Sequence, residues 1–147
     1  MRAYTSRRMA IVNALVEALS KIDGSGYYRT ALSSVEPRLK FWDEIQEFPA
    51  VHVSAGSETR QYQAAGYKDR FLNVTIRCYV REENPTEALE ALLEDIETVL
   101  EENSSLAYLD STGAQQRTHQ ITIIGIDTDE GVLDPLGVGE MQIEVRY

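Results

Sequence analysis

The sequence contains few of the residues from which catalytic and metal sites are usually built. It has one cysteine, Cys78, and two histidines, His52 and His119, among 147 residues. A single cysteine excludes an intrachain disulfide and fits a reducing compartment, and no cluster of cysteine and histidine is present to bind zinc. Cys78 falls on the apolar phase of a predicted strand, where a free cysteine usually acts as a small hydrophobe. Both histidines fall on polar phases, where we expect surface side chains rather than catalytic groups.

Long apolar runs and known catalytic motifs are absent as well. No stretch of about 18 apolar residues occurs, so the sequence predicts no membrane span, and we expect the chain to stay in the cytoplasm where it is made. The G-x-S-x-G elbow, the P-loop and the dinucleotide fingerprint are missing. The acidic run at residues 127–134 fails the EF-hand pattern, because Gly131 and Val138 stand where ligands belong. The sequence therefore predicts neither an enzyme nor a protein that binds a cofactor or metal.

Basic charge is scarce, and the acidic charge is unevenly placed. The net charge is −10, and nine of the 24 acidic residues lie in residues 82–102, which contain no Lys or Arg. The rest of the chain has 14 basic residues against 24 − 9 = 15 acidic ones, and residues 1–40 are net basic. Binding of nucleic acid through its phosphates needs clustered Lys and Arg, so the total argues against it. What stands out is charge segregated along the chain.

Two segments carry apolar residues at helical spacing. Thr5 or Ser6 is placed to cap the first helix, whose apolar face includes Ile11, Leu15 and Ile22, and Gly24 or Gly26 is placed to end it. Arg7 and Arg8 fall outside that face. The second helix follows Asn84 as N-cap, Pro85 at N1 and Glu87 at N3, a capping-box pattern, and carries an apolar stripe. The members of that stripe are Leu89, Leu92, Leu93, Ile96 and Leu100.

Alternating apolar and polar residues predict the strands. The clearest are residues 49–56, 70–82, 119–131 and 139–147, and a further strand is expected near residues 28–32. Residues 41–48 predict an irregular or short helical link, and residues 129–139 a hairpin connection. Residues 57–69 and 103–118 predict long polar connections, and long connections in compact domains are often functional. We expect residues 1–147 to form one α+β domain: a mostly antiparallel sheet of four to five strands with two helices packed on one face.

The glutamates of the second helix form one row. Glu87, Glu90, Glu94, Glu97 and Glu101 fall within about 80° of arc on a helix of 3.6 residues per turn. A helical metal site would pair such carboxylates with histidine and draw ligands from several helices, and here neither occurs. The row is either a solvated helix face or a surface that faces positive charge. Like charges at this spacing destabilise a helix by about 0.2–0.5 kcal/mol per pair, so we expect compensation from Arg7 and Arg8, from a neighbouring subunit, or from a function that uses a negative surface.

The order of these segments resembles the tail terminator proteins of long-tailed bacteriophages, also called tail completion or minor tail protein U-like proteins. The likeness is carried by the capped first helix, "FPAVHVSAGSET", the polar connection, "RFLNVTIRCYVRE", the acidic helix that begins Asn-Pro, and two closing strands. It extends from about residue 5 to 147. It is a likeness of length, order and texture, with no diagnostic motif.

This resemblance implies a structural role in the virion. Members of the family form a hexameric ring on the completed tail tube, stop its growth and provide the surface to which the head attaches. The implied partners are other copies of the chain, the tail tube protein and a head–tail connector, while DNA passes through without specific binding. The implied location is the head-proximal end of the tail, after assembly in the host cytoplasm. The family has no catalytic residues, so none is assigned here.

Two other functions fit the same sequence. One is another structural protein, either a connector or neck ring of the head–tail junction or a tube-like protein of a contractile particle. The other is a small ferredoxin-like enzyme or ligand-binding domain. A ring needs unlike surfaces on one chain, and segregated charge supplies them. The candidate interaction residues are the basic pair of the first helix, the polar connection and the glutamate row: Arg7, Arg8, Arg60, Tyr62, Tyr67, Lys68, Glu87, Glu90, Glu94, Glu97 and Glu101.

Overall fold

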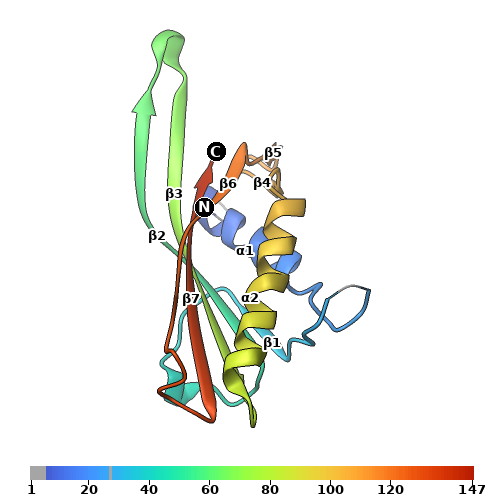
Figure 1. The fold of residues 1–147 in the computed structure, drawn as a ribbon. Helices are drawn as coiled ribbons and strands as arrows, with labels where there is room; N and C mark the ends of the chain where they lie inside the picture. Colours follow the sequence, from blue (N-terminus) through green and yellow to red (C-terminus); the bar gives the residue numbers. More distant parts are fainter. Residues whose placement is uncertain (1–5, 27) are drawn as a thin grey trace.

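The computed structural model describes residues 6–26 and 28–147, and its centre is a five-stranded sheet in the order β1-β2-β3-β7-β6 (Figure 1). The strands are β1 (Ser34–Glu36), β2 (Ala50–Tyr62), β3 (Lys68–Arg81), β6 (Gln120–Thr128) and β7 (Leu136–Arg146). A separate two-stranded sheet pairs β4 (Ala107–Leu109) with β5 (Gln115–Arg117). The helices are α1 (Arg7–Leu19) and α2 (Pro85–Glu102), with short 3₁₀ turns η1 (Trp42–Glu44) and η2 (Ala64–Gly66). The predicted α+β class is confirmed, although β1 runs parallel to β2 and makes the sheet mixed.

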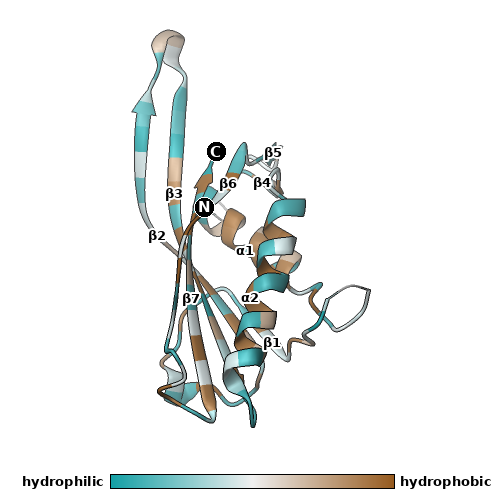
Figure 2. Ribbon diagram, in the orientation of Figure 1, coloured by the Kyte–Doolittle hydropathy of each residue, from teal (hydrophilic) through white to brown (hydrophobic). Residues whose placement is uncertain are grey.

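One apolar core joins both helices to one face of the sheet (Figures 1 and 2). Val74, Ile76 and Cys78 of β3 point into this core, and the apolar stripe predicted for α2 is buried with them. Asn73, Thr75 and Arg77 alternate with them onto the opposite, polar face, where Thr75 donates to Gln142 and Arg77 pairs with Glu140. Burial on one face and polar contacts on the other follow from the two-residue period of a strand. Cys78 is fully buried, as its phase predicts.

Beyond the core, β2 and β3 continue as a two-stranded projection (Figure 1). We call residues 61–69 the arm, because there the two strands pair only with each other, and β7 ends beside Phe71. Tyr62 and Tyr67 are 69% and 73% exposed on it. The predicted loop at residues 57–69 is therefore wrong: both strands run through it and turn at η2. The polar sequence showed no apolar face because none of the residues that the structure describes covers the arm.

The first predicted strand lies elsewhere for a specific reason. Residues 28–32 form no strand of the sheet, since the N–H groups of Arg29 and Thr30 donate to the carboxylate of Asp95, at 3.0 and 2.9 Å. The strand forms instead at Ser34–Glu36. Similarly, residues 103–118 are not a plain loop but contain β4 and β5. The irregular link at residues 41–48 and the hairpin between β6 and β7 are confirmed.

The helix ends also differ in part from expectation. Ser6 caps α1 by accepting from the N–H of Met9 at 3.2 Å, whereas Thr5 lies outside the described residues. The helix ends at Leu19 rather than at Gly24 or Gly26, because the following turn tightens to i→i−3 bonds. Asn84 is the N-cap of α2 and Pro85 opens the helix, but the capping box does not form. The Asn84 side-chain amide donates to the Glu87 carboxylate at 2.9 Å instead.

Candidate interaction surfaces

The glutamate row lies on the solvent-exposed face of α2, as the sequence predicts, and Figure 2 shows hydrophilic bands along this helix. Glu87, Glu90, Glu94, Glu97 and Glu101 are all exposed. The one ion pair that the described residues form with the row is Glu94–Arg29, at 2.8 Å, with both side chains about 60% exposed. The row also borders a shallow groove of ≈ 520 Å³, into which Ile126 of β6 projects an apolar side chain. A negative surface with an apolar rim is thus offered beside the β6 edge of the sheet.

Arg7 and Arg8 do not compensate this row, although they were candidates for it. The Arg7 guanidinium donates to the Tyr108 hydroxyl at 2.8 Å and lies over the ring of Tyr147, 5.0 Å from its centre. Its Nε is buried without a hydrogen-bond partner among the described residues. Arg8 donates to the carbonyl of Gly56 on β2. Both arginines therefore fasten α1 to neighbouring elements of the same chain.

The base of the arm is anchored by a polar cluster that the sequence did not reveal. The Glu58 carboxylate accepts from the Tyr147 hydroxyl and pairs with Arg60 at 2.7 Å. Burial raises the pKa of Glu58, but these two hydrogen bonds outweigh burial and leave that pKa below its ordinary value. Arg70 packs over the Tyr147 ring at 5.6 Å from its centre. These contacts fix the base of the arm to the rest of the domain.

Three of the candidate residues, Arg60 at the base of the arm and Tyr62 and Lys68 on it, lie on one side of the two strands. Arg60 pairs in register with Arg70, and Tyr62 with Lys68, so these four side chains share one face of the ribbon. The Lys68 ammonium lies 5.6 Å from the centre of the Tyr62 ring. Tyr67 lies beside the turn at η2. The structure brings Arg60, Tyr62, Tyr67 and Lys68 together on one projecting element with a basic and aromatic surface.

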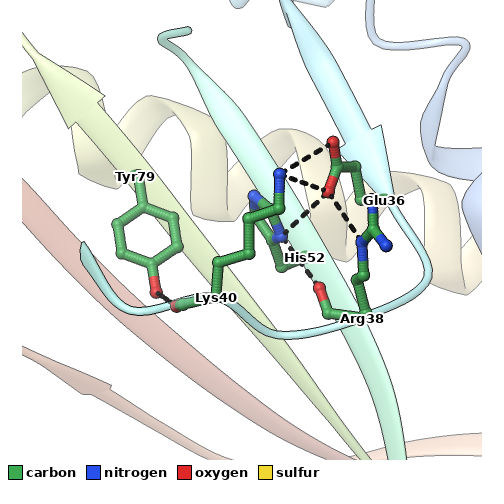
Figure 3. Close-up of polar contacts among 5 residues, drawn as sticks. All are labelled: Glu36, Arg38, Lys40, His52 and Tyr79. Carbon is green, nitrogen blue, oxygen red and sulfur yellow. Dashed lines mark hydrogen bonds and ion pairs between the residues drawn. The ribbon is translucent and has the colours of Figure 1, made fainter. Parts of the chain in front are cut away.

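A second polar cluster pins the connection between β1 and β2 (Figure 3). Glu36 pairs with Lys40 at 3.1 Å and with Arg38 at 3.4 Å. His52 Nδ1 lies 2.8 Å from the carbonyl oxygen of Arg38, and the Tyr79 hydroxyl donates to the carbonyl of Lys40 at 3.0 Å. The hydrogen bond from Lys40 lowers the pKa of Glu36 most. His52 is 2% exposed, so its expected place on the surface is wrong: this connection folds over it.

The described residues offer little of what metal sites and membrane spans require. Among residues 6–26 and 28–147, no group of three or more His, Cys, Asp and Glu side chains is arranged to hold a metal ion. Neither α1 nor α2 is long and apolar enough to cross a membrane. Asp95, the buried acid of α2, is occupied by the backbone donors of Arg29 and Thr30.

Comparison with known proteins decides the family. The profile described as Bacteriophage Tail Tube Terminator Protein matches residues 5–147, which is nearly the whole chain. The chain belongs to the bacteriophage tail tube terminator family. It is also 37% identical over 150 aligned residues to the tail tube terminator protein p142 of Escherichia phage T5, covering 95% of this chain and 92% of that protein. The resemblance of the sequence to tail terminators is thereby confirmed.

A solved structure supports the fold of this tail tube terminator family member. A chain from the virion of a native gene transfer agent particle superposes with a TM-score of 0.57, at 11% identity, covering 93% of both chains. At that identity the likeness bears on the fold alone. Family membership makes the chain a structural component of a phage tail.

Proposed function

We propose that this chain assembles into a closed ring, most simply of six copies, at the head-proximal end of the tail tube. There the ring ends tube polymerisation and forms the surface to which the head attaches, and it acts through binding rather than catalysis. Support comes from the tail tube terminator profile, which matches residues 5–147. The tail tube protein and a head–tail connector are the partners of this ring, which is assembled in the host cytoplasm.

The sheet supplies the two unlike sides that a head-to-tail ring requires. Among the described residues, the short β1 pairs with Ala50–His52 of β2, and beyond them β2, which carries the arm, forms one edge of the sheet; β6, with α2 beside it, forms the other edge. The first side presents Arg60, Tyr62 and Lys68, and the second presents the glutamate row together with Ile126. Opposite charge on opposite sides favours contact between the arm of one copy and α2 of the next.

The exposure of the arm favours a state in which the arm packs against a partner. A two-stranded hairpin without an apolar face to bury is only marginally stable in water. Here every residue from Thr59 to Lys68 is exposed, and two of them are tyrosines. Tyrosine and arginine are the side chains that most often carry the binding energy of protein interfaces. Packing against a neighbouring copy would cover these side chains and stabilise the arm.

The glutamate row that remains outside this contact suits the wall of a DNA channel. Carboxylates repel the phosphates of a passing duplex, so DNA slides through without being held. In this assignment, one part of α2 contacts the arm of the neighbouring copy. The glutamates along the rest of α2 line the channel with negative charge.

Tube growth in the presence of the purified protein tests the proposal. We expect added protein to stop elongation of tubes reassembled from the cognate tube protein, and electron micrographs to show a ring at one tube end. Native mass spectrometry of the capped tubes after mild dissociation should release one closed oligomer. Tubes that grow to the same length with and without the protein would contradict the proposal.

A further inference from the structure

The end of the sheet opposite the arm carries large apolar side chains that the candidate surfaces do not explain. Phe41 and Trp42 are 74% and 55% exposed at the start of η1, and Val132 and Leu133 are 82% and 40% exposed on the β6–β7 turn. We call these four residues the base surface. Both turns lie at the end of the sheet where β3 ends and β7 begins, since Tyr79 pairs with Val138 and bonds to Lys40. Figure 1 shows both turns at the end away from the arm.

The segment that carries Phe41 and Trp42 is held from several directions. The cluster of Figure 3 bonds its first part through the carbonyls of Arg38 and Lys40. Ser33 fixes its far end, because the Ser33 hydroxyl donates to the carbonyl of Phe48 at 2.7 Å. A buried histidine, a buried tyrosine and a network of ion pairs thus serve to hold two exposed aromatic side chains in place.

The β6–β7 turn is fixed in a comparable way. The Asp129 carboxylate accepts from the N–H groups of Leu133 and Val138, at 3.1 and 3.2 Å. Glu82 donates its N–H to the carbonyl of Pro135 at 3.1 Å, which ties the turn to the end of β3. Exposed aromatic and aliphatic side chains on pre-organised turns lose little entropy on binding, so they suit an interface core.

The charge around the base surface indicates the chemistry of its partner. Residues 41–48 contain three acidic residues and residues 127–135 contain four, and neither segment contains Lys or Arg. A partner complementary to this end has an apolar pocket bordered by basic side chains. The base surface also lies along the strand direction, away from the β2 and β6 sides at which copies of the chain would meet.

We infer that the base surface is the docking surface for the end of the tail tube, with Phe41 and Trp42 inserted into an apolar pocket bordered by Lys or Arg. This inference rests on the proposed function for the identity of the partner. It assigns the two ends of the molecule: the base faces the tube, and the arm faces away from it.

Exposed side chains permit a test without loss of the fold. The variant Phe41→Ser with Trp42→Ser is compared with Leu109→Ser, a control at a side chain that is 59% exposed on β4, far from the base. Tubes reassembled without terminator are incubated with each protein, and bound protein is measured after sedimentation. We expect the double variant to bind tubes at least tenfold more weakly, with its oligomer and melting temperature unchanged, and Leu109→Ser to bind as the wild type does.

Trp42 also provides a direct readout, because it is the single tryptophan of the chain. Protein labelled with 5-fluorotryptophan gives one fluorine resonance, which should shift or broaden on tubes and stay unchanged on assembly of the free ring. Unaltered tube binding by the double variant, a resonance that ignores tubes, or loss of the ring in the double variant would each overturn the inference. Failure of the wild type to bind tubes at all would instead refute the proposed function, so the two failures are distinguishable.

The polar cluster of Figure 3 holds Phe41 and Trp42 in position and does not itself contact the tube. Tyr79→Phe removes the hydroxyl that bonds to Lys40 while keeping the ring. We expect tube binding about threefold to tenfold weaker, through the loss of one hydrogen bond that orders the segment. Tube binding equal to that of the wild type would remove Tyr79 from this role.

Discussion

Reversal of charge on α2 separates a functional acidic surface from a solvated one. The variant changes Glu90, Glu94 and Glu97 to Lys, at three exposed positions of the row. Folding should hardly respond, because the pairs of position 90 with Glu87 and of position 97 with Glu101 become opposite-charged, while the pairs 90/94 and 94/97 stay like-charged. Each such pair contributes only about 0.2–0.5 kcal/mol. The lost Glu94–Arg29 pair is well exposed, and exposed pairs contribute only about 0–1 kcal/mol. We therefore expect a melting temperature within a few degrees of the wild type.

Assembly should respond strongly to the same change. Like charges brought together across an interface cost several kcal/mol, and about 3 kcal/mol weakens each contact roughly a hundredfold. Mass photometry over a concentration series should show rings of the wild type and smaller species of the variant. Adding Arg60→Glu and Lys68→Glu to the same chain should restore part of the ring, because the charges of both sides are then exchanged. A ring of unchanged stability in the triple variant would refute the contact between the arm and α2.

Three further predictions concern single groups. Asp95→Ala leaves the N–H groups of Arg29 and Thr30 without their acceptor and should lower the free energy of unfolding by about 2 kcal/mol. Glu97→Ala on the same helix should change it by less than about 0.5 kcal/mol, and equal effects in urea unfolding would contradict this reading. The lowered pKa of Glu36 means that its ion pairs stabilise the fold above the ordinary value of 4.5 and are lost as the pH falls through the lower folded pKa. Trp42 fluorescence should therefore change below pH 4.5 before the far-ultraviolet circular dichroism does, and Glu36→Gln should remove this early step. Burial raises the pKa of Cys78 to about 12, so a thiol reagent at pH 8 should label the protein only when it unfolds; rapid labelling of the folded protein would contradict its burial.

The elements that bury an apolar face could be read from the sequence. The alternation in β3 and β7 and the leucine stripe of α2 follow from the periods of strand and helix, and the structure places them as expected. The position of β1 could not be read, because the backbone donors of residues 29 and 30 bond to Asp95 more than 60 residues away. The arm could not be recognised either, since strands without a covered face look like polar loops.

The site residues also divide into those whose place follows from local sequence pattern and those whose place depends on distant parts of the chain. The exposure of the glutamate row follows from helix geometry, and the gathering of Arg60, Tyr62 and Lys68 follows once the hairpin is known. The helical pattern predicts Arg7 outside the apolar face of α1, yet β4 and the end of the chain fold around it. His52 was missed for a comparable reason: only a connection from elsewhere in the chain buries it. Local pattern reports which face a residue takes, but not what covers that face.

Cryo-electron microscopy of tail tubes capped by this protein would test the central claim most directly. We expect one closed ring at one tube end, with the arm of each copy against α2 of the next and with Phe41 and Trp42 at the tube. Single copies scattered along the tube, or a ring whose neighbours meet through neither the arm nor α2, would contradict it.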